Sequence, residues 1–160
     1  MVRGPSGAVF FIAVWLALLG TSTLSGGQTP VAVETVRKAL EDIAVGRGAI
    51  EPLVVTYDDL HGLWGGLRLT IRGTGHVEQV AVRQEAGEPQ QVSRNDLVKL
   101  VALLVRHAAW DQRVPERAPV PDESQAYLTI RYGEISVRVW EWHTDLERNR
   151  RIGEIRFGIS

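Results

Sequence analysis

The sequence has 160 residues, no cysteine and a formal net charge of −1, from 18 Lys and Arg against 19 Asp and Glu. This balance gives no electrostatic attraction toward nucleic acid or an anionic membrane, so neither is expected as a partner. Without cysteine there are no disulfides and no thiolate nucleophile. About 130 residues remain after an N-terminal segment is set apart, which suits one domain with one core.

The N-terminal segment, residues 1–27, has the three-part pattern of a secretory signal peptide. Arg3 supplies a positive charge, residues 8–19 form an unbroken apolar run of 12, and small residues follow as far as Gly27. The run is shorter than the roughly 20 residues that span a bilayer. We therefore expect cleavage near Ser25 or Gly27 and a secreted or periplasmic protein with no membrane attachment. An uncleaved N-terminal anchor is the alternative.

Residues 28–50 are predicted to form an N-terminal helix and a linker. Thr29 can cap the helix, Pro30 suits its first position, and Gly46 is a natural end. Apolar residues recur at helical spacing inside it. The helix could pack loosely or form a separate arm, and residues 51–160 are predicted to be a single domain.

That domain begins with three predicted strands, at residues 53–57, 67–72 and 76–83, with a Gly-Thr-Gly turn at 73–75. The alternation of the third strand is irregular near Val77, which suggests a β-bulge. A Leu-rich helix follows at 93–110, where Ser93 and Asp96 resemble a capping box. A proline-rich connection ends it.

The segment 126–142 is predicted to be a β-hairpin that turns at Tyr132 and Gly133 or at Gly133 and Glu134. One face is apolar and is expected in the core: Ala126, Leu128, Ile130, Ile135, Val137 and Val139. Residues 152–157 could add a last strand. The chain is therefore predicted to be α+β: an antiparallel sheet of about five or six strands packed by one Leu-rich helix, with an extra N-terminal helix.

The opposite face of this hairpin is the predicted partner-binding surface. It carries Tyr127, Arg138, Trp140 and Trp142 among polar residues. Aromatic side chains and arginine are typical of binding surfaces, because they bury large areas with few rotamers and retain polar groups. Arg138 could stack on Trp140 or Tyr127 as a cation–π pair. The alternative is that the N-terminal helix covers this face.

The stretch DDLHGLWGG, residues 58–66, is the other candidate. Asp58, Asp59 and His61, with His76, could build a hydrolase-type site, and this remains the enzymatic alternative. However, the four histidines are scattered, and no metal-ligand spacing, Gly-x-Ser-x-Gly elbow or phosphate loop is present. We therefore predict no catalytic residues, no metal and no cofactor. The stretch is interpreted as a glycine-rich connection in which Trp64 and His61 take part in recognition.

Three glycines at 62, 65 and 66 are followed by Gly75, and then by Pro121 and Asp122 before Tyr127. In this pattern, residues 53–157 resemble small exported bacterial α+β domains, including metalloprotease inhibitors of the emfourin type. The His and Trp of the glycine-rich loop and the helix at 30–46 depart from it. The resemblance implies a non-catalytic domain whose partner is another exported protein, such as a protease that it inhibits. We expect a monomer, and a structural envelope protein is the other alternative.

Overall fold

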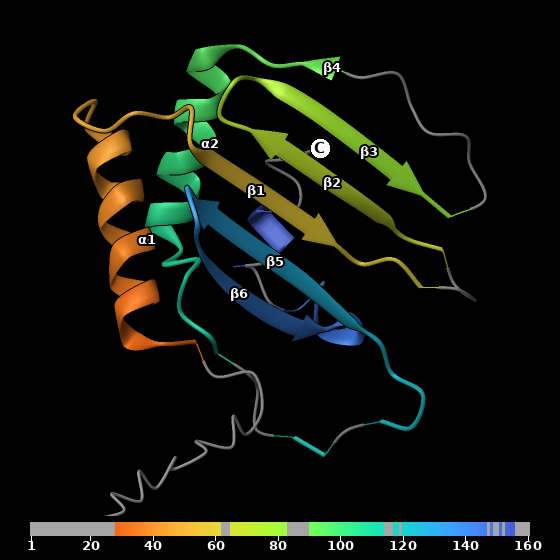
Figure 1. Cartoon of the computed structure of the whole chain (residues 1–160). Helices are drawn as coiled ribbons and strands as arrows, with labels where there is room; N and C mark the ends of the chain where they lie inside the picture. The colour runs from red at the N-terminus through yellow and green to blue at the C-terminus, as the bar shows by residue number, and fades with distance from the viewer. Residues whose placement is uncertain are drawn as a thin grey trace, which may run out of the picture.

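The computed structural model describes residues 28–61, 65–82, 90–113, 117–118, 120–146, 148, 151 and 153–155. These residues form a six-stranded antiparallel sheet with helices, which confirms the predicted α+β class (Figure 1). The predicted signal peptide at 1–27 and Trp64 lie outside the described residues. Within the described part of the chain, no helix has the length and apolar character needed to cross a bilayer.

The sheet has the strand order β4-β3-β2-β1-β5-β6. Its strands are β1 Leu53–Asp58, β2 Leu67–Arg72, β3 His76–Ala81, β4 Gln90–Gln91, β5 Gln125–Tyr132 and β6 Ile135–Trp142. The first strand in the chain is central, since β1 pairs with β2 on one side and with β5 on the other. Strands from the two halves of the sequence thereby meet in one sheet.

Two local predictions about this sheet are wrong. Residues 153–155 are helical, so the expected last strand at 152–157 does not form, and the sixth strand is β4 instead. There is also no bulge near Val77, because β2 and β3 pair without a break from Leu67↔Ala81 to Ile71↔Val77. The alternation is weak there because Val77 is the only buried residue of this strand.

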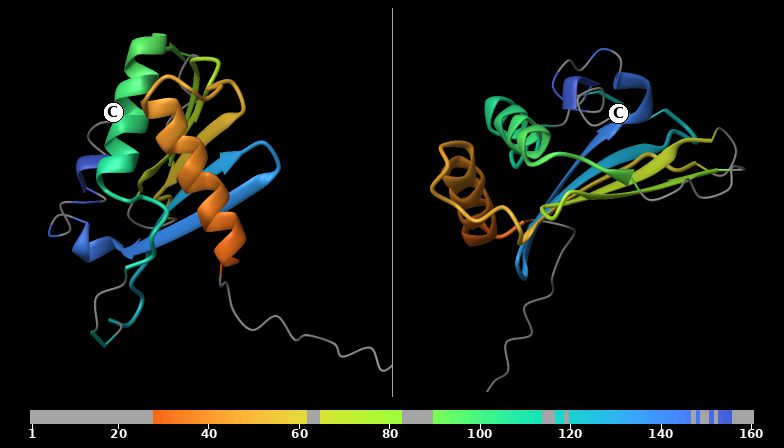
Figure 2. Two further views of the ribbon diagram at one scale, coloured as in Figure 1. Left: turned by 90° about the vertical axis from the view of Figure 1, so that its left-hand side faces the viewer. Right: turned by 90° about the horizontal axis from the view of Figure 1, so that it is seen from above.

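The two long α-helices of the described residues are α1 Pro30–Ala44 and α2 Arg94–Arg106. Thr29 Oγ1 accepts a hydrogen bond from the Ala32 amide, and Ser93 Oγ accepts one from the Asp96 amide, so each helix has a side-chain cap. Both helices lie on the same side of the sheet and contact each other (Figure 2). The short 3-10 helix η1, His143–Asp145, follows β6.

The core lies between these helices and one face of the sheet. Buried apolar side chains of α1, α2 and all strands except β4 form a single cluster, which also holds Leu146 and Ile155 from the C-terminal part. Residues 28–50 contribute to this cluster through Val36, Leu40, Ile43 and Ile50, each at most 3% exposed. At the start of β1, the chain passes so close to the β2–β3 turn that a Cβ at Gly73 would lie 1.7 Å from the Ile50 carbonyl oxygen. Only glycine permits this approach.

Candidate functional site

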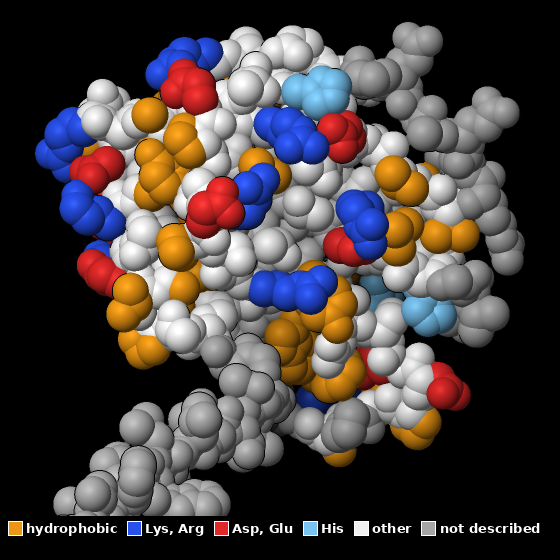
Figure 3. All heavy atoms as spheres, viewed as in Figure 1, with side chains coloured by type: hydrophobic (Ala, Val, Ile, Leu, Met, Phe, Trp, Pro, Cys, Tyr) orange, Lys and Arg blue, Asp and Glu red, His pale blue; other side chains and the backbone are white. Residues whose placement is uncertain are grey.

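The other face of the sheet has no described helix over it (Figure 2). Because side chains alternate along each strand, the residues between the core positions point to this face. The register aligns them in rows, of which one runs Thr70, Thr56, Thr129 and Arg138 across β2, β1, β5 and β6. Figure 3 shows acidic and basic side chains in neighbouring pairs on this face, with hydrophobic side chains gathered below them.

In the half of the face that belongs to β1, β2 and β3, the charges neutralise one another. Arg68 Nη2 lies 2.7 Å from Asp58 Oδ2, and Arg72 Nη2 lies 3.1 Å from Glu78 Oε1. His76 Nε2 also lies 3.4 Å from the same Glu78 oxygen. These are exposed or half-exposed pairs, which contribute little to stability and leave few free charges for a ligand.

The half that belongs to β5 and β6 has a different composition. We call it the aromatic–arginine surface and define it as Tyr127, Arg131, Arg138, Trp140 and Trp142. The Arg138 guanidinium carbon lies 4.2 Å from the centroid of the Tyr127 ring, so the predicted cation–π contact is made with tyrosine. Trp140 and Trp142 meet edge to face, with centroids 5.1 Å apart and an interplanar angle of 83°. The two aromatic contacts order these side chains before any partner binds.

Arg117 extends this surface and was missed by the sequence analysis. Its guanidinium carbon lies 5.2 Å from the centroid of the Trp142 ring. The residue belongs to the proline-rich connection between α2 and β5, and no local pattern marks it. Only the fold brings it to the end of β6.

Helix α1 does not cover the aromatic–arginine surface, because its buried side chains belong to the core on the opposite face. Gln28, just before this helix, donates a hydrogen bond to the Arg138 carbonyl oxygen at the β6 edge. Gln112 bonds both the amide and the carbonyl oxygen of Trp140, at 2.8 and 2.9 Å. A pocket of about 300 Å³ lies between these residues and Val33 and Trp110. Two glutamine side chains therefore form hydrogen bonds with backbone groups that would otherwise be unpaired at the edge strand β6.

The stretch 58–66 shows no assembled catalytic group in its described residues. Asp59 is 2% exposed, and it accepts hydrogen bonds from the Tyr57 hydroxyl at 2.9 Å and the Leu67 amide at 2.6 Å. Asp58 pairs with Arg68 on the uncovered face instead. His61 exchanges backbone hydrogen bonds with Gly65. The two neighbouring carboxylates therefore lie in different environments, Asp59 in the interior and Asp58 on the uncovered face. The predicted contact residue Trp64 lies outside the described residues.

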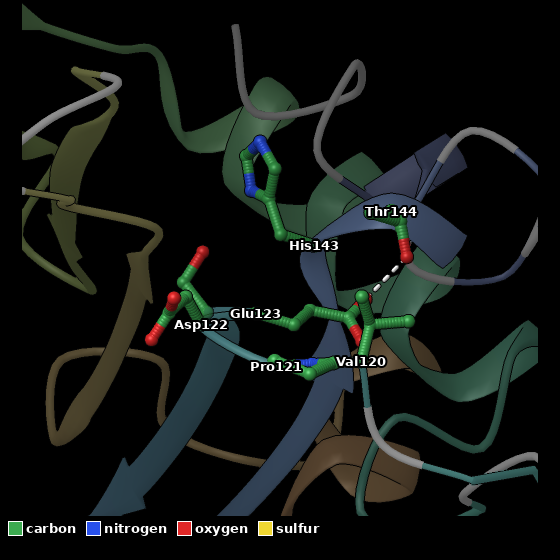
Figure 4. Close-up of a pocket in the computed structure, with 7 residues that line it drawn as sticks. Val120, Pro121, Asp122, Glu123, His143 and Thr144 are labelled. Carbon is green, nitrogen blue, oxygen red and sulfur yellow. Dashed lines mark hydrogen bonds between the residues drawn. The ribbon is translucent and has the colours of Figure 1, made fainter.

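A second feature is a pocket of about 390 Å³ at the end of the β5–β6 hairpin (Figure 4). It is lined by Val120, Pro121, Asp122, Glu123, Ser124, His143 and Thr144. The Glu123 side chain is only 2% exposed, and its Oε1 accepts hydrogen bonds from Arg117 at 2.6 Å and from the Thr144 hydroxyl. The Arg117 hydrogen bond is the main cause that lowers the pKa of Glu123 from 4.5 to about 2. Arg117 Nε also donates to Asp145 Oδ2 at 2.6 Å, and these two carboxylates raise the pKa of Arg117.

No metal site is evident in the described ranges, where no three His, Asp or Glu side chains are grouped to hold an ion. No family model, no curated protein and no solved structure matches this chain.

Proposed function

We propose that this protein is an exported, non-catalytic domain that binds another protein through its aromatic–arginine surface. The observation that carries the proposal is that Tyr127, Arg138, Trp140 and Trp142 lie together on the sheet face opposite the helices. Export is supported by the signal-peptide pattern of residues 1–27.

The physical argument starts from the order of these side chains. Binding normally costs about 0.5–1.5 kcal/mol for each mobile side chain that a partner immobilises. Here Arg138 already lies on Tyr127, and the two tryptophans already contact each other. Tryptophan, tyrosine and arginine are also the residue types that contribute most to binding energy in protein interfaces. The surface is thus organised for association before a partner arrives.

The positive charges of the aromatic–arginine surface favour a partner with acidic side chains. Among the described residues, Arg131 donates a hydrogen bond to the Gly133 carbonyl oxygen and Arg138 lies over the Tyr127 ring, and neither arginine is paired with a carboxylate. On β1–β3 each arginine of this face has an acidic neighbour. A partner segment that brings Asp or Glu side chains would complement the two arginines. The resemblance to emfourin-type inhibitors favours an exported metalloprotease as that partner, and inhibition as the result of binding.

The test is a capture experiment with residues 28–160 immobilised. Secreted and periplasmic proteins of the producing organism are passed over the protein, and bound species are identified by mass spectrometry. The double variant Trp140→Ala and Trp142→Ala should weaken binding by about 30-fold or more if these residues act as interface hot spots. The matched control is Thr70→Ala, which lies on the same face in β2. A captured protease is then assayed for inhibition by the wild type and the double variant.

The outcomes separate the candidate functions. A single partner lost in the double variant and kept in Thr70→Ala supports the proposal. A partner that binds both variants equally places the interface elsewhere. An empty column, together with a solution mass above that of a monomer, supports a structural envelope protein instead.

A further inference from the structure

Glu123, which lines the pocket at the end of the β5–β6 hairpin, has one carboxylate oxygen without a hydrogen-bond donor among the described residues. Oε1 accepts from two donors, whereas the described part of the chain supplies none to the buried Oε2. The side chain is 2% exposed, so bulk water does not replace the missing donor. A buried carboxylate oxygen of this kind normally has a partner. A ligand that donates hydrogen bonds would supply this partner.

The charges around the pocket decide what that group is. Asp122, Glu123 and Asp145 contribute three negative charges, and Arg117 contributes one positive charge, so these four residues have a net charge of −2. Glu123 stays ionised at neutral pH, because Arg117 and Thr144 hold its pKa at about 2. His143 adds a buried ring nitrogen, Nδ1, that has no hydrogen-bond partner among the described residues. A cation is favoured over a neutral or an anionic group.

We infer that this pocket binds the cationic end of an alkyl chain, a primary ammonium or a guanidinium of the kind that Lys and Arg side chains carry. Val120 and Pro121 line the same pocket and can contact the methylene groups of such a chain. Figure 4 shows Asp122 and His143 beside the pocket and Glu123 turned toward Thr144. The volume of about 390 Å³ is sufficient for one such side chain.

The fluorescence of Trp142 is expected to report on binding in this pocket. Arg117 contacts Glu123 in the pocket and lies 5.2 Å from the Trp142 ring centroid. A cation that approaches Glu123 changes the field at Arg117 and therefore at the indole. Tryptophan fluorescence should respond to binding, and the Trp142→Phe variant should remove that response while amide shifts at Ser124 and Thr144 persist.

The experiment titrates the full chain with N-acetyl-lysine methylamide and N-acetyl-arginine methylamide, followed by fluorescence and by amide chemical shifts. N-acetyl-norleucine methylamide is the neutral comparison. We expect saturable binding of both cationic probes, and binding about tenfold weaker for the neutral one, because it lacks charge-assisted hydrogen bonds. Shifts should centre on Ser124, His143 and Thr144.

Two variants test the assignment. Asp122 has a φ of 62°, which asparagine also adopts readily, so Asp122→Asn removes a charge without straining the backbone. It should weaken the cationic probes about threefold or more. Glu134→Gln, in the turn at the other end of the hairpin, removes the same charge and should leave binding unchanged. The inference would be overturned by any of three results. The neutral probe could bind as tightly as the cationic ones, Asp122→Asn and Glu134→Gln could weaken binding equally, or the cationic probes could show no saturable binding. Glu123→Gln should abolish binding. If the Glu123→Gln protein does not fold, the Asp122→Asn variant still tests the inference.

Discussion

At the scale of single residues, Asp58 and Asp59 show how one peptide bond separates two roles. Asp58 ends β1 on the uncovered face, where it pairs with the half-exposed Arg68. Asp59 turns inward and accepts hydrogen bonds from the Tyr57 hydroxyl and the Leu67 amide. A buried acceptor that satisfies buried donors matters more to stability than an exposed ion pair. The difference is therefore measurable by substitution.

We predict that Asp59→Ala lowers the free energy of unfolding by about 1–3 kcal/mol, because it removes the buried carboxylate that accepts hydrogen bonds from the Tyr57 hydroxyl and the Leu67 amide. Asp58→Ala should lower it by about 1 kcal/mol or less, since it removes an ion pair whose arginine is half-exposed to solvent. Urea denaturation followed by circular dichroism measures both. If Asp58→Ala is the more destabilising of the two, the structural role assigned to Asp59 is wrong.

At the scale of elements, the Arg117 network joins segments that are far apart in the sequence. Arg117 donates hydrogen bonds to Glu123, in the loop before β5. It also donates to Asp145 and Thr144, in η1, and so connects the two segments. It also lies over Trp142 at the end of β6. One guanidinium with several donors in a fixed plane can hold all these groups together, which an ammonium could not.

This network predicts an acid-dependent loss of stability. The folded-state pKa of Glu123 is about 2, below its ordinary value of 4.5, so its contribution is complete above pH 4.5 and is lost as pH falls through about 2. In that window the unfolded state binds up to about one more proton at this residue than the folded state. Glu123→Gln should remove this proton uptake, so its unfolding free energy should depend less steeply on pH than that of the wild type. Denaturation series across this pH range measure the two slopes. Parallel slopes would show that Glu123 does not carry the effect.

At the scale of the whole molecule, α1 and the C-terminal residues close the core. Leu40 of α1 and Ile155 near the C-terminus are both 0% exposed, although 115 positions separate them in the sequence. All the described helical elements lie on one side of the sheet, and the described residues leave the other side without a helix over it. The core therefore forms on one side only, and the proposed partner would bind the other side.

We predict that Leu40→Ala lowers the free energy of unfolding of the entire domain by about 2–5 kcal/mol, the usual cost of a large-to-small change in a core. Val31→Ala, in the same helix at a position 75% exposed, should change it by less than about 0.5 kcal/mol. The measurement is thermal unfolding observed both by far-ultraviolet circular dichroism and by tryptophan fluorescence. Separate transitions in the two signals would mean that α1 folds as an independent arm.

Local sequence determined most of the secondary structure, including α1, α2 and β1, and the two faces of the hairpin. Alternation predicted that Ala126, Leu128 and Ile130 would be buried, and they are, at 2% exposure or less. The predicted burial of Ile135 is wrong, since this residue begins the edge strand β6 and is 39% exposed. The residues of the aromatic–arginine surface were also predicted to share a face, because that requires only a period of two and a short turn.

Only the tertiary structure decided which surfaces are covered and which distant residues meet. Periodicity shows that α1 has an apolar side, but it cannot show which face of the sheet that side packs against. The position of β4 and the helical residues 153–155 depend on neighbours rather than on local pattern. Arg117, Glu123 and Thr144 come together through chain connections that leave no spacing signal. Local preferences act over a few residues, whereas packing and charge pairing act between segments, and the pocket depends on the second kind of interaction.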